Sequence, residues 1–85
     1  MNNHKTSKEF NILIGQKLRL MRKRAGLQQN EAAAMLQMSA ANLSNLEGGY
    51  STASPEIIYC ACCIYGCRLS DVFPRLVNAK MEVAG

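Results

Sequence analysis

The residues best suited to chemistry lie in one short uncharged stretch, SAANLSN, which is residues 39–45. An asparagine amide can form two hydrogen bonds with adenine in the major groove of DNA, and an alanine methyl can contact the methyl of thymine. Asn42 and Asn45 lie three residues apart, so on a helix they face the same way. The pattern indicates a face that reads base edges and weakly favours an A/T-containing site. Ordinary surface polarity is the alternative interpretation.

The four cysteines form a second cluster, CACCIYGC. On a helix, Cys60, Cys63 and Cys67 share one face, whereas Cys62 falls on the side of the core. Thiolates at such spacing could share a metal ion or exchange disulfides. However, no histidine is near and Arg68 is the only cation close by. We therefore expect the cysteines to pack as small buried hydrophobes, with no metal and no cofactor.

An enzyme is disfavoured by the residues that are missing. The sequence has no paired carboxylates and no nucleophile beside a base, and its one histidine, His4, lies close to the start. We expect no catalytic residues and no small-molecule substrate.

Composition and charge favour a folded domain with a polyanionic partner. Of 85 residues, 48% are hydrophobic and 19% charged, which is typical of one globular domain. The formal net charge of +4 favours DNA as the partner. A run of basic residues comprises Lys17, Arg19, Arg22, Lys23 and Arg24. It is either a solvated helix face or a set of contacts to phosphate. No Lys or Arg occurs between Ala25 and Cys67.

The apolar runs are much shorter than a membrane span, and the first ten residues lack the apolar core of a signal peptide. We therefore expect a cytoplasmic protein.

Hydrophobic spacing predicts an all-α, compact five-helix domain. The expected helices cover residues 9–24, 29–36, 40–47, 55–65 and a segment from Leu69. The domain would span residues 9–79, between a flexible arm at 1–8, with Lys5 and Lys8, and a flexible tail at 80–85. Apolar side chains expected to face inward include Met35, Leu36, Met38, Leu43, Leu46, Val72, Phe73, Leu76 and Val77.

Capping residues mark the expected helix ends. Ser39, Ser54 and Ser70 each precede a helical pattern and can accept a hydrogen bond from an unpaired backbone N–H. The pair Gly48-Gly49 suits a left-handed C-cap.

Together these segments resemble the lambda-repressor-like (Cro/repressor, XRE) helix-turn-helix family of transcription regulators. The matching segments are IGQKLRLMRKRAGLQQ, MLQMS, LSNLEGG, SPEII and GCRLSDVF, which extend from Ile14 to Phe73. The family usually has leucine where Ala32 stands and often glycine where Gln37 stands. Arginine or lysine is common in the family around Ala40, Asn45 and Gly48.

The resemblance implies roles for individual residues. Gln29 matches a glutamine that bonds a phosphate and braces the recognition helix, and Gln28 lies beside it. Arg22 and Glu47 match positions where some members hold a structural ion pair. The candidate DNA-binding residues are Gln28, Gln29, Ser39, Ala40, Ala41, Asn42, Ser44 and Asn45.

The helix expected at 55–65 is apolar on nearly every side, so one stripe would stay exposed in a monomer. We expect a homodimer through this stripe, which comprises Ile57, Cys60, Cys63, Ile64 and Cys67. Such a dimer would read two half-sites of a palindromic operator about 34 Å apart. The function expected is that of a sequence-specific double-stranded DNA-binding regulator, acting as a repressor or autoregulator. A protein-interaction module and a cysteine-based redox or metal sensor remain the alternatives.

Overall fold

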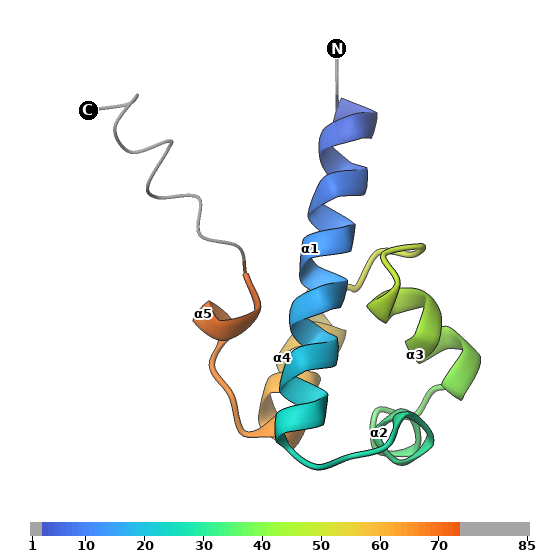
Figure 1. Cartoon of the computed structure of the whole chain (residues 1–85), viewed down its shortest axis with the longest axis vertical. Helices are drawn as coiled ribbons and strands as arrows, with labels where there is room; N and C mark the ends of the chain where they lie inside the picture. Colours follow the sequence, from blue (N-terminus) through green and yellow to red (C-terminus); the bar gives the residue numbers. More distant parts are fainter. Residues whose placement is uncertain (1–2, 74–85) are drawn as a thin grey trace.

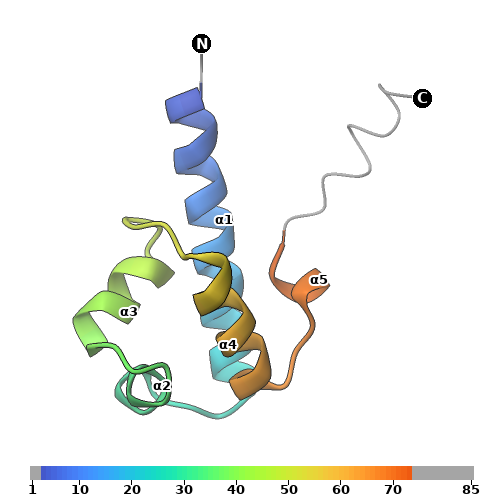
Figure 2. The same ribbon diagram turned by 180° about the vertical axis from the view of Figure 1, so that it is seen from behind.

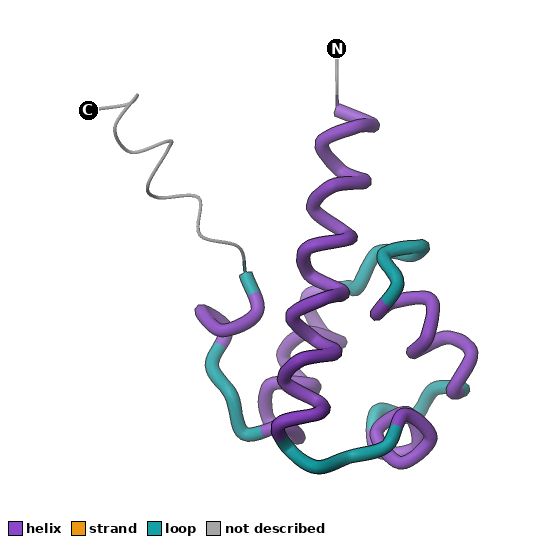
Figure 3. Tube along the Cα trace, in the orientation of Figure 1, coloured by secondary structure: helices purple, strands orange, loops and turns teal. Residues whose placement is uncertain are grey.

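The computed structural model of the chain describes residues 3–73. Its five helices are α1 (Asn3–Arg24), α2 (Gln29–Met35), α3 (Ala40–Glu47), α4 (Pro55–Tyr65) and α5 (Leu69–Val72) (Figure 1). Over residues 3–73 there is no strand (Figure 3). The prediction of an all-α, five-helix domain is confirmed. In the same part of the chain, no helix combines the length and the apolar character that a membrane crossing requires.

Helix α1 is the element around which the others gather. Helices α2 and α3 lie on one side of α1 and α5 on the other, and α4 packs behind it (Figures 1 and 2). The first turns of α1 project beyond the other helices (Figure 1). The core where they meet contains Ile14, Leu18, Met21, Ala32, Ala33, Leu43, Ile58, Ala61, Cys62, Tyr65 and Val72.

The serine caps of α3 and α4 are present. The backbone N–H of Asn42 donates to Ser39 Oγ at 3.0 Å, and the N–H of Ile57 donates to Ser54 Oγ at 3.1 Å. Each bond satisfies one of the N–H groups that a helix start leaves unpaired.

One predicted helix start and one predicted helix cap are wrong. Helix α1 begins at Asn3 instead of Glu9, so residues 3–8, predicted as a flexible arm, are helical. No glycine or proline occurs among these residues to end the helix. Helix α5 begins at Leu69, and Ser70 does not cap it. The carboxylate of Asp71 accepts the N–H of Arg68 at 2.9 Å instead.

Two side chains predicted to face inward are exposed. Met35 is 53% exposed because α2 turns its small residues, Ala32 and Ala33, toward the core. Phe73 is 38% exposed and stacks on Phe10 of α1, with ring centroids 6.3 Å apart. The predictions for Leu76, Val77 and the tail at 80–85 lie outside the described residues.

Helix α1 and the end of α3 approach each other at two glycines. A Cβ on Gly15 would come within 2.7 Å of the Glu47 carbonyl oxygen and still closer to that of Leu46. A Cβ on Gly49 would lie 2.7 Å from the Cα of Ile12, and Gly49 has a left-handed φ of 80°. Of the predicted Gly48-Gly49 cap, only Gly49 is left-handed, since Gly48 has φ −82°. This close contact fixes where α3 sits on α1.

Candidate nucleic-acid interface

Helix α3 has one buried side and one exposed side. Leu43, Leu46 and Glu47 are buried, and they attach the helix to the rest of the domain. The side chains predicted to read DNA are all exposed; they are Ser39, Ala40, Ala41, Asn42, Ser44 and Asn45. The structure therefore brings these six residues together on one uncharged surface, which we call the recognition face.

A tight turn holds α2 against α3. The N–H of Met38 donates to the carbonyl of Ala33 at 2.9 Å, which folds the chain back on α2. Gln37 lies in this turn with φ 60°, a left-handed conformation that favours glycine. Met38 and Leu36 pack partly against the core and anchor the turn.

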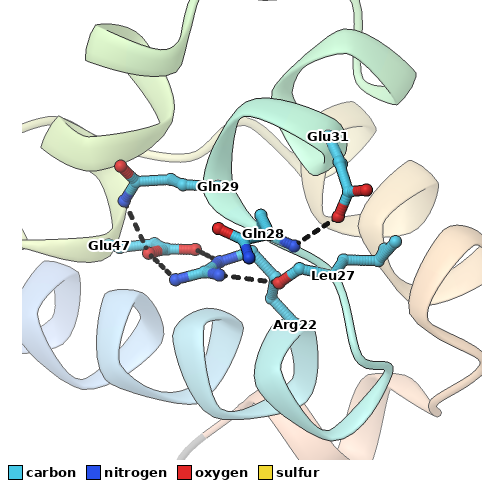
Figure 4. Close-up of polar contacts among 6 residues, drawn as sticks. All are labelled: Arg22, Leu27, Gln28, Gln29, Glu31 and Glu47. Carbon is cyan, nitrogen blue, oxygen red and sulfur yellow. Dashed lines mark hydrogen bonds and ion pairs between the residues drawn. The ribbon is translucent and has the colours of Figure 1, made fainter.

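A buried ion pair fixes the C-terminal end of α3. Arg22 Nε donates to Glu47 Oε2 at 2.7 Å and Arg22 Nη2 donates to Glu47 Oε1 at 3.0 Å (Figure 4). Arg22 Nη1 also donates to the Leu27 carbonyl at 2.8 Å. The hydrogen bond to Glu47 is the main reason why the pKa of Arg22 is raised. The structure thus contains the pair that the family resemblance implied, and one guanidinium joins α1, the following loop and α3.

Gln29 completes this network from the start of α2. Its Nε2 donates to Glu47 Oε1 at 3.0 Å, so Gln29 contacts the recognition helix through Glu47 (Figure 4). Gln28, beside it, is exposed, and its backbone N–H donates to Glu31 Oε1 at 2.7 Å. Both glutamines therefore lie at the N-terminus of α2, where helix amides favour an anion such as phosphate.

Tyr65 lies close enough to the ion pair for both charges to affect its pKa. Its hydroxyl is buried and has no hydrogen-bond partner among the described residues. Burial raises the pKa of Tyr65 to about 12, with a further contribution from the negative charge of Glu47. The phenol is therefore neutral at ordinary pH.

The positive charge is concentrated on α1. Arg22 is buried in its ion pair and is not available to phosphate. The other members of the basic run, Lys17, Arg19, Lys23 and Arg24, are exposed. From residue 26 to 66 the charged residues are acids only, namely Glu31, Glu47 and Glu56. The recognition face therefore offers hydrogen-bonding groups and methyl groups but no positive charge.

Sequence reasoning assigned no role to the residues of the loop that follows α3. Asn11 of α1 donates from Nδ2 to Thr52 Oγ1 at 3.0 Å, which ties this loop to α1. Tyr50 is 84% exposed and its ring lies against Gly48, where an added Cβ would come within 2.7 Å of the ring. The sequence could have indicated this contact, because a large aromatic residue, Tyr50, directly follows two glycines.

The cysteines of α4 divide between core and surface. Cys62 is buried as predicted, and burial raises the pKa of its thiol to about 11, so it is a poor nucleophile at neutral pH. Cys60 and Cys63 are exposed. Ile64 and Cys67 were predicted to remain exposed with them, but they pack partly against the core because α5 folds back beside α4. Within residues 3–73, no three potential ligand side chains gather into a metal site.

Comparisons with known proteins agree with this geometry. The family model described as "Helix-turn-helix domain" matches residues 13–72. The competence pilus inhibition repressor of Acinetobacter baylyi is 37% identical over 69 residues, which are 81% of this chain and 63% of that protein. The chain thus spans less than two thirds of the length of that relative.

Two solved structures are similar to the domain. One is the clp gene regulator ClgR from C. glutamicum, with a TM-score of 0.70, 30% identity, and coverage of 74% of this chain and 81% of that one. The other is the restriction-modification controller protein C.AhdI from Aeromonas hydrophila, with a TM-score of 0.72, 21% identity, and coverage of 78% and 96%. At 21% identity the second similarity concerns the fold alone. The chain belongs to the lambda-repressor-like (Cro/repressor, XRE) family of helix-turn-helix transcription regulators.

Proposed function

We propose that this protein binds double-stranded DNA of defined sequence and regulates transcription as a homodimeric repressor or autoregulator. The observation that carries the proposal is the recognition face, an exposed uncharged side of α3 whose other side is fixed by buried Leu43, Leu46 and the Arg22–Glu47 pair. A helix held this rigidly can enter a major groove without losing further conformational freedom. The repressor from Acinetobacter baylyi, 37% identical, supports the same reading.

The contacts divide into two kinds. Asn42 and Asn45 would hydrogen-bond base edges, and Ala40 and Ala41 would contact thymine methyls. Gln28 and Gln29 would bind a phosphate at the N-terminus of α2 and so set the register of α3 on the duplex. Gln29 keeps its amide oxygen and one N–H after donating to Glu47, so its role in the network leaves a donor for phosphate.

Dimerisation would compensate for the weak charge of the recognition face, because two faces bind one palindromic operator. Within the proposed interface on α4, Cys60 and Cys63 are exposed and Ile57 is half-buried. Ile64 and Cys67, already partly packed, would contribute less area. A dimer bound over a promoter would exclude RNA polymerase, so regulation would follow protein concentration.

The dimer is tested with Ile57→Glu, which would place a charge in the interface without touching the core. We expect a folded monomer by analytical ultracentrifugation and weaker operator binding. Glu56→Gln, at the neighbouring exposed position, is the matched control and should leave the mass unchanged. An Ile57→Glu variant with the same mass as the unmodified protein would remove this interface.

The function is tested by selection from a pool of random duplex DNA, followed by a salt titration on the enriched sequence. We expect a two-fold symmetric motif and an affinity that falls as salt rises, because phosphate binding releases counterions. If the folded protein enriched no sequence, the recognition face would bind another partner and the proposal would be wrong.

A further inference from the structure

A groove of about 580 Å³ lies between α3 and α4. It is bounded by the turn before α3, by α3 itself, by the loop after it and by the first turns of α4, which face the viewer in Figure 2. Met38, Leu46 and Ile57 form an apolar part of its wall. Its volume falls within the ~300–1,000 Å³ typical of small-molecule sites.

The charge of the groove is negative. Of the residues that line it, Glu56 is the one whose side chain belongs to a charged type. The nearby Glu47 is neutralised by Arg22 at 2.7 Å, and the stretch from 26 to 66 contains no Lys, Arg or His. A carboxylate or phosphate ligand would therefore meet repulsion with no compensating cation, whereas an ammonium group would find a partner in Glu56.

The groove also contains a residue held in an unfavourable conformation. Gln37 lines it and has φ 60°, where a side chain is disfavoured by about 1 kcal/mol relative to glycine. No hydrogen bond of the Gln37 side chain within residues 3–73 compensates for this conformation. A glutamine at this position thus leaves an amide in the groove at a cost in stability.

We propose that the groove binds a small amphipathic cation. Its apolar body would lie against Met38 and Leu46, its ammonium group beside Glu56, and its polar edge within reach of the Gln37 amide. Asn42 and Asn45 line the same groove and belong to the recognition face. The bound cation therefore engages the side chains that read DNA, and cation and operator exclude each other. This last step rests on the proposed function.

Binding is tested first without DNA, by an NMR titration of the full chain with 2-phenylethylamine. We expect saturable shifts confined to the groove. The matched probes 2-phenylethanol and 3-phenylpropanoate carry the same ring with no charge and with a negative charge. The alcohol should bind more weakly and the acid should produce no saturable shift. Equal binding of the acid, or shifts elsewhere on the domain, would overturn the proposal.

Two variants separate ligand contact from folding. Glu56→Gln should weaken amine binding by about 1.4- to 5-fold, the effect of one exposed charge pair. Gln37→Gly should weaken it by about 2- to 12-fold, the effect of one hydrogen bond, while making the domain more stable. Gln37→Asn tolerates the left-handed turn and keeps the amide, so it should bind better than Gln37→Gly. Unchanged affinity in both Glu56→Gln and Gln37→Gly would place the amine elsewhere.

The coupling is then measured by fluorescence anisotropy on the selected operator. We expect 2-phenylethylamine to raise the apparent Kd for DNA and the operator to raise the Kd for the amine by the same factor, as linkage requires. An amine that fills the groove and leaves DNA affinity unchanged would contradict exclusion. If no operator were enriched, the proposed function would fail, while the NMR titration would still decide whether the groove binds cations.

Discussion

Replacing Arg22 by Met should remove a large part of the stability of the domain. Arg22 and Glu47 are each 6% exposed, and the guanidinium donates to Glu47 at 2.7 and 3.0 Å and to the Leu27 carbonyl at 2.8 Å. Without Arg22, the Glu47 carboxylate stays buried, and the Gln29 amide is its one side-chain donor within residues 3–73. Breaking a buried pair from one side costs about 3–5 kcal/mol. A domain of this length has only about 4–13 kcal/mol in total.

The assay is urea unfolding followed by circular dichroism, with Arg24→Met as the control. Arg24 is exposed near the end of the same helix, so its replacement should change the free energy of unfolding by less than about 0.5 kcal/mol. The double variant Arg22→Met with Glu47→Leu removes both charges and should recover to within about 1–2 kcal/mol of the unmodified protein. If Arg22→Met were as stable as Arg24→Met, or if the double variant were no more stable than Arg22→Met, the reasoning about buried charge would be refuted.

Two other variants test the packing around α1 and α4. Gly15→Ala should lower the free energy of unfolding by about 1–3 kcal/mol, although alanine favours helices, because its methyl would meet backbone carbonyls of α3 that cannot move separately; thermal unfolding that shows equal or higher stability would contradict this contact. Tyr65→Phe should raise the free energy of unfolding by about 1 kcal/mol at pH 7, because it removes a buried hydroxyl without a partner. The pKa of Tyr65 in the folded protein, about 12, exceeds its ordinary value of 10.0. The unfolded chain therefore loses the phenol proton first, and the free energy of unfolding falls as the pH rises from 10 toward 12. Urea unfolding between pH 9 and 12 should therefore show a smaller loss in Tyr65→Phe, and an identical loss in both proteins would be evidence against the raised pKa.

Features controlled by neighbouring residues could be predicted from the sequence. Ser39 and Ser54 each accept a backbone N–H three residues ahead, and both caps were expected. Ser70 does not act as a cap because Asp71 accepts the N–H of Arg68, which places the N-cap of α5 at Arg68, two residues before Ser70.

Features controlled by contacts between helices were not predictable from spacing alone. Met35 has the hydrophobicity of a core residue, but the rotation of α2 on α3 turns Ala32 and Ala33 inward instead. Gly15 interrupts a good helical pattern, and only the approach of the α3 carbonyls explains its presence.

The sequence predicted the exposed residues of the candidate site better than the hydrogen bonds that hold its helices together. The exposure of Asn42 and Asn45 follows from helical periodicity once Leu43 and Leu46 are buried. The Arg22–Glu47 pair joins positions 25 residues apart, so no local rule indicates it, and it was expected only from the family resemblance. The family resemblance implied that Gln29 braces α3, and the structure shows that it does so through Glu47.

The central claim is that the amides of α3 read base edges. The most direct test measures, by competition anisotropy, the ratio of affinities for the selected operator and for a scrambled duplex, in the unmodified protein and in Asn45→Ala. Gln16→Ala, which removes an exposed amide from α1, is the control. We expect Asn45→Ala to lower this ratio by about 5- to 150-fold, the effect of one bidentate base contact, while binding to the scrambled duplex is unchanged. An equal loss on both duplexes, or the same ratio as in Gln16→Ala, would contradict base reading by α3.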